Sequence, residues 1–251
     1  MRRDLVEIDI CTQKDISDVQ YADKLLRYCQ ECGLQFRKVG TYQPLRNDFT
    51  PELFRTCWCT KSTGKRYTGE DYVAGGVIAS LKGTTGGVMA DWKITSRDNI
   101  VVKGIVYNWI HIWFSYKFAQ SHLPQIERLY LDLITEFEPE HAHMGTEAGS
   151  DRGIYVKKPL FHQSIQWCTY LSKEHMAEIR EKFDQIPWPY RQELEQGTWI
   201  KLSELPPKEG DPLIAQCIEY NVQLWGLKTW KMKWAEDAGP NGIPYSPIKK
   251  E

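Results

Sequence analysis

Three consecutive segments between residues 72 and 116 constrain the fold of this chain most strongly. They read YVAGGVIASL (72–81), GVMADWKIT (87–95) and IVVKGIVYNWIHIWFSY (100–116), and they are rich in the β-branched and aromatic residues that favour strands. The separators KGTTGG and SRDN are short and polar, as hairpin turns are. The sequence therefore predicts an antiparallel meander of three strands.

The third of these segments is apolar on both faces. Successive residues of a strand point to opposite sides, so its side chains divide into two sets. One set is Val106, Ile110, Ile112 and Phe114, and the other is Tyr107, Trp109, His111 and Trp113. Because both sets are apolar or aromatic, we expect a central strand that is covered on both sides.

Helical periodicity is present on both sides of the meander. In ISDVQYADKLLRYCQECG (16–33), apolar residues recur at helical spacing and Gly33 stands at a C-cap position. In DFTPELFRTCW (48–58), Thr50 is a candidate N-cap and Pro51 would be the first helical residue. Further helices are predicted for SHLPQIERLYLDLITEF (121–137), KEHMAEIREKF (173–183) and, as one or two closing helices, residues 211–236.

The remaining strands and loops complete an α+β pattern. Strands are predicted for LVEIDI (5–10), QFRKVGTYQ (35–43), HAHMGT (141–146), SIQWCTYLS (164–172) and TWIKLS (198–203). STGKRYTGED (62–71) is expected to be a loop, and DQIPWPYRQELEQG (184–197) a Pro- and Trp-rich connection. We expect a single α+β domain over residues 1–238, with a mixed, mostly antiparallel sheet and flanking helices, and a mobile tail over 239–251.

The charge distribution bears on the class of partner. The chain has 32 Lys and Arg against 33 Asp and Glu, so it lacks the basic surplus that direct binding of nucleic acid usually needs. Residues 130–195 nevertheless carry 12 acidic against 7 basic residues, whereas residues 1–66 carry 9 against 12. The acidic region is either a solvated face or a surface that steers a basic partner.

Several features point to the cytoplasm. The start, MRRDLVEIDI, has no apolar run like that of a secretory signal. The most apolar stretch, IVYNWIHIWF (105–114), is too short for a membrane helix. Seven cysteines cannot all form disulfides within one chain, so we expect reduced thiols in a cytoplasmic protein.

The stretch EPEHAHMGTEAG (138–149) is the strongest candidate for a chemical site. On a strand, His141 and His143 point to the same side and could bind one metal ion. Such a site needs further ligands, and those available are Glu138, Glu140, His162 and His175. The simpler alternative is a structural strand that carries two histidines, and we expect neither a metal nor another cofactor.

Other motifs favour binding over catalysis. The cysteines of CQEC (29–32) and CWC (57–59) are best explained as small buried side chains rather than zinc ligands. STGKRYTG (62–69) lacks the first glycine of a phosphate-binding loop. Ten tryptophans and thirteen tyrosines supply residue types common at interfaces, and Trp188, between two prolines, is the candidate exposed anchor.

Residues 100–227 carry a recognisable order of features: the helix LPQIERLYLDLITEF, then EPEHAHMGTE, the strand IQWCTYLS, a helix, ELEQGTWIKLSE and DPLIAQCIEYNVQLWGL. This order resembles the immunity protein 52 family of bacterial polymorphic-toxin systems. The family more typically has Gly-Trp where this chain has Gln166 and Trp167. The resemblance implies a cytoplasmic, non-enzymatic immunity protein made beside a toxin, which is often delivered by a type VI secretion system.

The resemblance also implies a nuclease toxin of restriction-endonuclease-like fold that is blocked sterically. A nuclease groove must be basic to hold phosphate, so carboxylates could occupy it in place of nucleic acid. The expected partner-binding residues are Glu138, Glu140, His141, His143, Glu147, Asp151 and Trp188. Two alternatives remain: a small metal-dependent hydrolase that uses His141 and His143, and an adaptor protein without a toxin.

Overall fold

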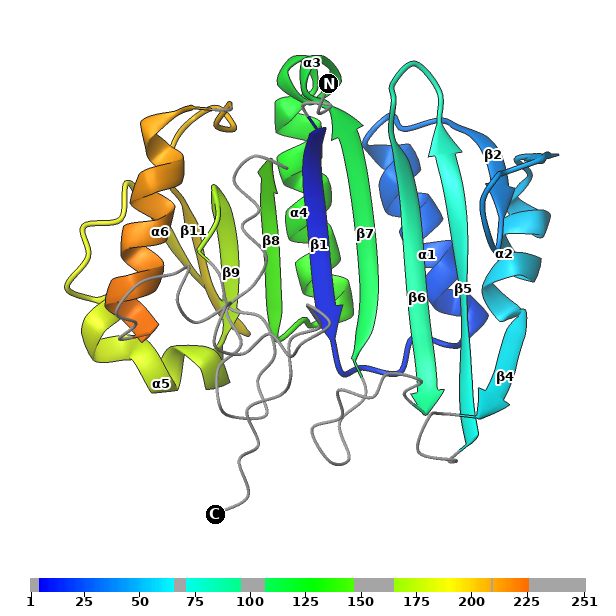
Figure 1. Ribbon diagram of the computed structural model, residues 1–251, viewed down its shortest axis with the longest axis horizontal. Helices are drawn as coiled ribbons and strands as arrows, with labels where there is room; N and C mark the ends of the chain where they lie inside the picture. Colours follow the sequence, from blue (N-terminus) through cyan, green and yellow to red (C-terminus); the bar gives the residue numbers. More distant parts are fainter. Residues whose placement is uncertain (1–4, 66–70, 96–106, 147–164, 209, 226–251) are drawn as a thin grey trace, which may run out of the picture.

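The computed structural model describes residues 5–65, 71–95, 107–146, 165–208 and 210–225, and these form one α+β domain, as predicted (Figure 1). Within them, eleven strands make a single sheet in the order β10-β11-β9-β8-β1-β7-β6-β5-β2-β3, and β4 also pairs with β5. Every pairing that joins these strands is antiparallel.

The strands span Leu5–Thr12 (β1), Phe36–Gly40 (β2), Asn47–Asp48 (β3), Lys61–Lys65 (β4), Asp71–Leu81 (β5), Gly87–Thr95 (β6), Asn108–Ser115 (β7), His141–Thr146 (β8), Cys168–Ser172 (β9), Tyr190–Leu194 (β10) and Gly197–Lys201 (β11). The helices span Val19–Glu31 (α1), Pro51–Cys59 (α2), Tyr116–Ser121 (α3), Leu123–Phe137 (α4), Lys173–Phe183 (α5) and Pro212–Trp225 (α6).

The predicted meander is confirmed by β5, β6 and β7, which are neighbours in the sheet. The first strand of the chain, β1, lies between β7 and β8 and is therefore central, although it comes from the N-terminus. Its partners are more than 90 residues away in sequence, so the centre of the sheet depends on long-range pairing.

Helix boundaries follow local signals in the sequence. The side chain of Asp18 accepts a hydrogen bond from the backbone N–H of Gln20 at the start of α1. Gly33, with φ +79°, follows the end of that helix, as its predicted C-cap role requires. The predicted cap of α2 is also confirmed, because Thr50 accepts a hydrogen bond from the N–H of Leu53 at 3.1 Å.

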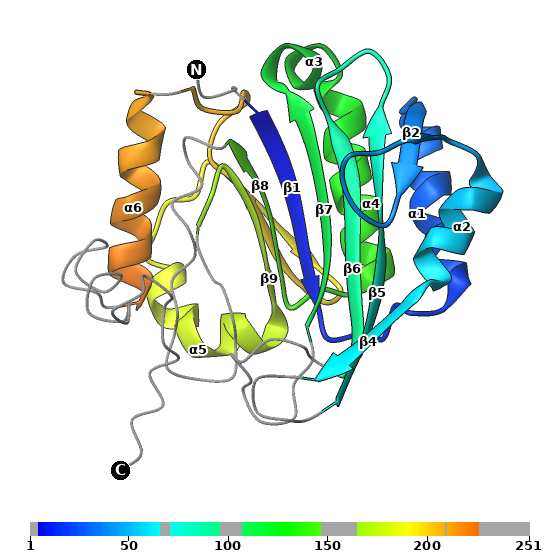
Figure 2. The ribbon, with the colours of Figure 1, turned by 45° about the vertical axis from the view of Figure 1, so that its right-hand side comes forward.

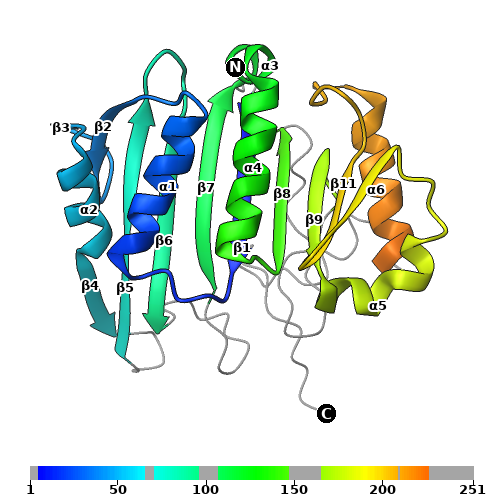
Figure 3. The same ribbon diagram turned by 180° about the vertical axis from the view of Figure 1, so that it is seen from behind.

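Helices cover the two faces of the sheet unequally. Helices α1, α2 and α4 lie on one face, seen from the front in Figure 3, and enclose the larger core with β1, β5, β6 and β7. Helices α5 and α6 lie on the opposite face, where they form a second core with β9 and β11 (Figure 2). The second face of β1 and β7 is therefore outside both described helical layers.

The expectation that β7 is a central strand is confirmed, and its two faces are buried to different degrees. Ile110, Ile112 and Phe114 are fully buried against the helices, whereas Trp109 and His111, on the other face, are only half-buried. Val106 lies outside the described residues. The predicted division of the side chains between the two faces of the strand was correct. Aromatic side chains on the second face, however, do not require a helix to pack over them.

Two expected connections contain strands. Residues 61–65, at the start of the expected loop, form β4 at the edge of β5, and residues 190–194 form β10 at the opposite edge of the sheet. Both are polar and largely exposed, so they lack the apolar alternation that marks a half-buried strand. The expected tail, 239–251, lies outside the described residues.

The cysteines behave largely as predicted. All seven are free thiols, and Cys11, Cys29, Cys32, Cys57, Cys168 and Cys217 are buried. Cys59, at the end of α2, is the exposed exception. Burial raises the pKa of the Cys29 thiol and the pKa of the Cys57 thiol, so both are held as neutral, apolar side chains.

Candidate functional site

A row of three polar side chains crosses the centre of the sheet on its half-buried face. Asp9 of β1 lies directly opposite His111 of β7 on one side and His143 of β8 on the other. His111 Nδ1 is 2.7 Å from Asp9 Oδ1, and His143 Nε2 is 3.2 Å from Asp9 Oδ2. One carboxylate thus bridges imidazoles from two different strands.

The electrostatics of this row favour charge on Asp9. Burial opposes ionisation of Asp9, but the hydrogen bonds from His111 and His143 outweigh it and hold its pKa well below the usual range. Burial also lowers the pKa of His111, yet the hydrogen bond and the charge of Asp9 more than compensate and raise it overall. The row can therefore hold a positive charge on His111 beside a fixed carboxylate.

The two histidines of the HAH motif lie on one face, as predicted, but not as a free pair. Their ring centroids are 5.4 Å apart, and His141 is only 2% exposed. The Nε2 atom of His143 contacts the carboxylate of Asp9, so this nitrogen is already engaged within the protein. Among the described residues, no group of three or more His, Cys, Asp or Glu side chains is arranged to hold a metal ion.

The sequence did not predict that Asp9 would contact both His143 and His111. His111 was placed on the correct face of its strand, but its register with β1 and β8 could not be read from one sequence. The alternation in LVEIDI, which places a carboxylate in the middle of a central strand, was the available signal.

Glu138 and Glu140 lie at the edge where α4 passes into β8. Glu138, at φ 46°, ends the helix in the left-handed region, and its carboxylate is 2.6 Å from Lys14 Nζ. Glu140 accepts a hydrogen bond from Gln13 and lies 3.5 Å from the hydroxyl of Tyr107.

Burial, and then the charge of Glu174, raise the pKa of Glu140 to about 7. The charge of Glu140 is therefore sensitive to pH near neutrality. Two further predicted residues, Glu147 and Asp151, lie outside the described residues.

Trp188 is half-buried rather than exposed. Its ring centroid is 4.7 Å from that of Phe183 and 4.9 Å from that of Tyr220, and its indole N–H donates to the backbone oxygen of Phe183 at 2.9 Å. It follows the end of α5, whereas Glu140 lies near Glu174 in the first turn of that helix. Trp188 and Glu140 therefore lie near opposite ends of α5.

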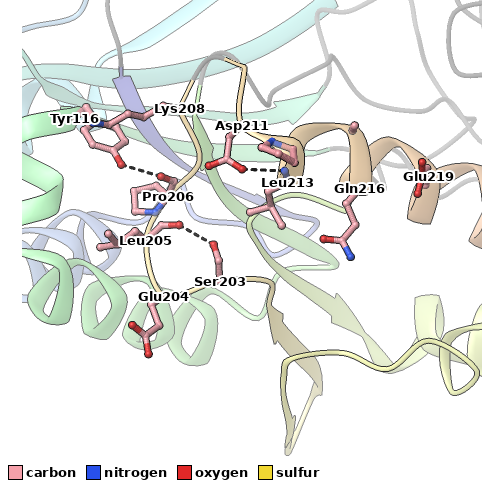
Figure 4. A pocket seen from close by; sticks show the side chains of 12 residues that line it. Tyr116, Ser203, Glu204, Leu205, Pro206, Lys208, Asp211, Leu213, Gln216 and Glu219 are labelled. Atoms are coloured by element: carbon pink, nitrogen blue, oxygen red, sulfur yellow. Dashed lines mark hydrogen bonds between the residues drawn. The ribbon is translucent and has the colours of Figure 1, made fainter.

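A groove of about 770 Å³ lies between the start of α3 and the loop that joins β11 to α6 (Figure 4). Hydrogen bonds connect residues that line it: the Tyr116 hydroxyl donates to the backbone oxygen of Pro206 at 2.8 Å, and the N–H of Leu213 donates to Asp211 at 2.9 Å. Sequence analysis did not single out these residues, since tertiary contact brings residue 116 to residues 203–219.

Comparison with solved structures finds a similar fold. The chain is similar to a structure described as Pseudomonas aeruginosa T6SS protein PA0821, with a TM-score of 0.56, 14% sequence identity, and coverage of 90% of this chain and 77% of that one. No protein-family model and no curated protein matches the sequence. At this identity the similarity concerns the fold. None of the described helices is long and apolar enough to cross a membrane.

Proposed function

We propose that this chain is an immunity protein that binds a toxin and neutralises it by stoichiometric, steric occlusion. The observation that carries the proposal is the fold shared with a type VI secretion system protein over 90% of the chain. The order of helices, strands and short motifs over residues 100–227 independently resembles the immunity protein 52 family. The fold similarity and the motif order both favour a protein of interbacterial competition.

The geometry of the histidines supports a binding role better than metal-dependent hydrolysis. A catalytic zinc needs three protein ligands that converge on one point and leave a position open. Here Asp9 lies between His111 and His143 and uses a different oxygen for each. The side chains of Asp9, His111 and His143 thus link the three adjacent strands β7, β1 and β8.

The proposed partner is a nuclease toxin encoded beside this chain, and the proposed location is the cytoplasm, where such a toxin would act. A nuclease must present a basic surface to phosphate, and an acidic region of a partner protein can cover that surface. Nucleic acid and membrane are not proposed as partners, and no cofactor is required for inhibition by occlusion.

Size-exclusion chromatography with an inactivated product of the adjacent gene tests the proposal. We expect the two proteins to elute as one complex of fixed stoichiometry. Two separate peaks at micromolar concentration of both proteins would contradict it. Metal analysis of protein purified without chelator tests the hydrolase alternative, which requires a stoichiometric bound metal.

A further inference from the structure

The groove between α3 and the β11–α6 loop combines apolar surface with carboxylates. Leu205 is 47% exposed there, beside Tyr116, Pro206 and Leu213. A single exposed leucine is ordinary on a protein surface, but here it lies in a concave surface together with other apolar side chains, which is the setting of many binding sites. The groove therefore offers both shape and apolar contact to a partner.

The charge of the groove is acidic. Glu204 in the loop, Asp211 at the start of α6 and Glu219 further along that helix are three carboxylates, against the single ammonium of Lys208. That ammonium lies 4.9 Å from the ring centroid of Tyr116, so the groove already holds one cation of the chain itself against its aromatic wall.

Among the described residues, some exposed acidic side chains are paired with a cation of the chain and others are not. Glu138 is bound by Lys14, and Glu193 is bound by Arg191 at 2.7 Å. In contrast, neither Glu204 nor Glu219 forms an ion pair within the part of the chain that the structure describes. Their charge is available to a partner.

We propose that this groove is the surface that binds the toxin, and that its occupant is a basic segment containing Lys or Arg and an apolar residue. The inference rests on the proposed function. A segment from the nucleic-acid groove of a nuclease has this chemistry, because it must carry cations to hold phosphate. Glu204 and Glu219 would attract its cations, and Leu205 would contact its apolar side chain.

The test compares the binding of the inactivated product of the adjacent gene to wild-type protein and to Glu204→Lys/Glu219→Lys. The matched control is Glu178→Lys/Glu181→Lys, which reverses two exposed charges on α5 outside the groove. We expect association with the groove variant to be at least about tenfold slower at low salt, with the difference shrinking at high salt. The control should stay within about twofold of the wild type.

A second variant, Leu205→Ser, keeps the charge and removes the apolar contact. It should dissociate from the toxin about tenfold faster, because loss of a contact acts mainly on the dissociation rate. Unchanged rates for both groove variants, with tight binding by the wild type, would overturn the groove assignment and leave the immunity function standing. Absence of binding by the wild type would overturn both. Unchanged melting temperatures of the variants confirm that they remain folded.

Discussion

At the scale of single residues, the central feature is the carboxylate of Asp9 between two imidazoles. A charged group in the middle of a central strand is costly unless it is hydrogen-bonded, and here both oxygens are. The bridge joins three adjacent strands, so its loss should lower the free energy of unfolding of the protein.

Asp9→Asn should lower the free energy of unfolding by about 1.5–3 kcal/mol, the usual contribution of hydrogen bonds to charged groups. The raised pKa of His111 means that its contribution is present below pH 6.5 and lost as pH rises through its folded pKa. The contribution of Asp9, whose pKa is lowered, is present above pH 3.8. In urea unfolding, the loss of unfolding free energy in Asp9→Asn relative to the wild type should therefore be largest between pH 3.8 and pH 6.5. At pH 9 this loss should be smaller. A deficit independent of pH would contradict the charged bridge.

Glu140→Gln should stabilise the protein at alkaline pH. Because the pKa of Glu140 is raised from 4.5 to about 7, wild-type stability is lost as pH rises between those values. Glutamine does not ionise, so the variant should match the wild type near pH 4.5 and exceed it at pH 8. Glu138→Gln, at an exposed carboxylate paired with Lys14, is the control and should give no gain. Equal stability of Glu140→Gln and wild type at pH 8 would contradict the claim that ionisation of Glu140 destabilises the folded protein.

At the scale of elements, Gly75 of β5 has a packing role at the contact with β6. A Cβ at Gly75 would lie 2.2 Å from the fully buried ring of Trp92 on β6. Gly75→Ala should therefore cost about 1–3 kcal/mol through overpacking, measured by thermal or urea unfolding. A variant as stable as the wild type would show that Trp92 moves without cost.

Trp188→Ala distinguishes a structural from a partner-binding role for this residue. Trp188 joins α5 to α6 through Phe183 and Tyr220, so we expect a loss of about 2 kcal/mol, below the value for a fully buried Trp. Tyr42→Ala, at a 74% exposed side chain, is the control and should have little effect. If Trp188→Ala kept full stability but bound the toxin weakly, the anchor interpretation would be correct instead.

The elements that sequence predicted best are those with strong periodicity or local caps. The meander, α1, α2 and α4 follow from residues close together in sequence. The edge strands β4 and β10 were missed because they are short and polar, and their pairing partners, rather than their own residues, define them.

At the scale of the whole molecule, predictability falls with sequence separation. The α+β class follows from local patterns, whereas the position of β1 at the centre of the sheet does not. The same limit applies to the candidate sites: the faces of His111 and His143 were predictable, but their meeting at Asp9 and the groove at Tyr116 depend on register and tertiary contact.

For the molecule as a whole, we propose an α+β protein that covers a toxin rather than one that performs chemistry. The most direct test of this proposal is growth of cells that express the active product of the adjacent gene, with and without this chain. We predict that wild-type protein restores growth, and that restoration requires about one copy per toxin because occlusion is stoichiometric. Continued toxicity despite folded, abundant protein would contradict the immunity function.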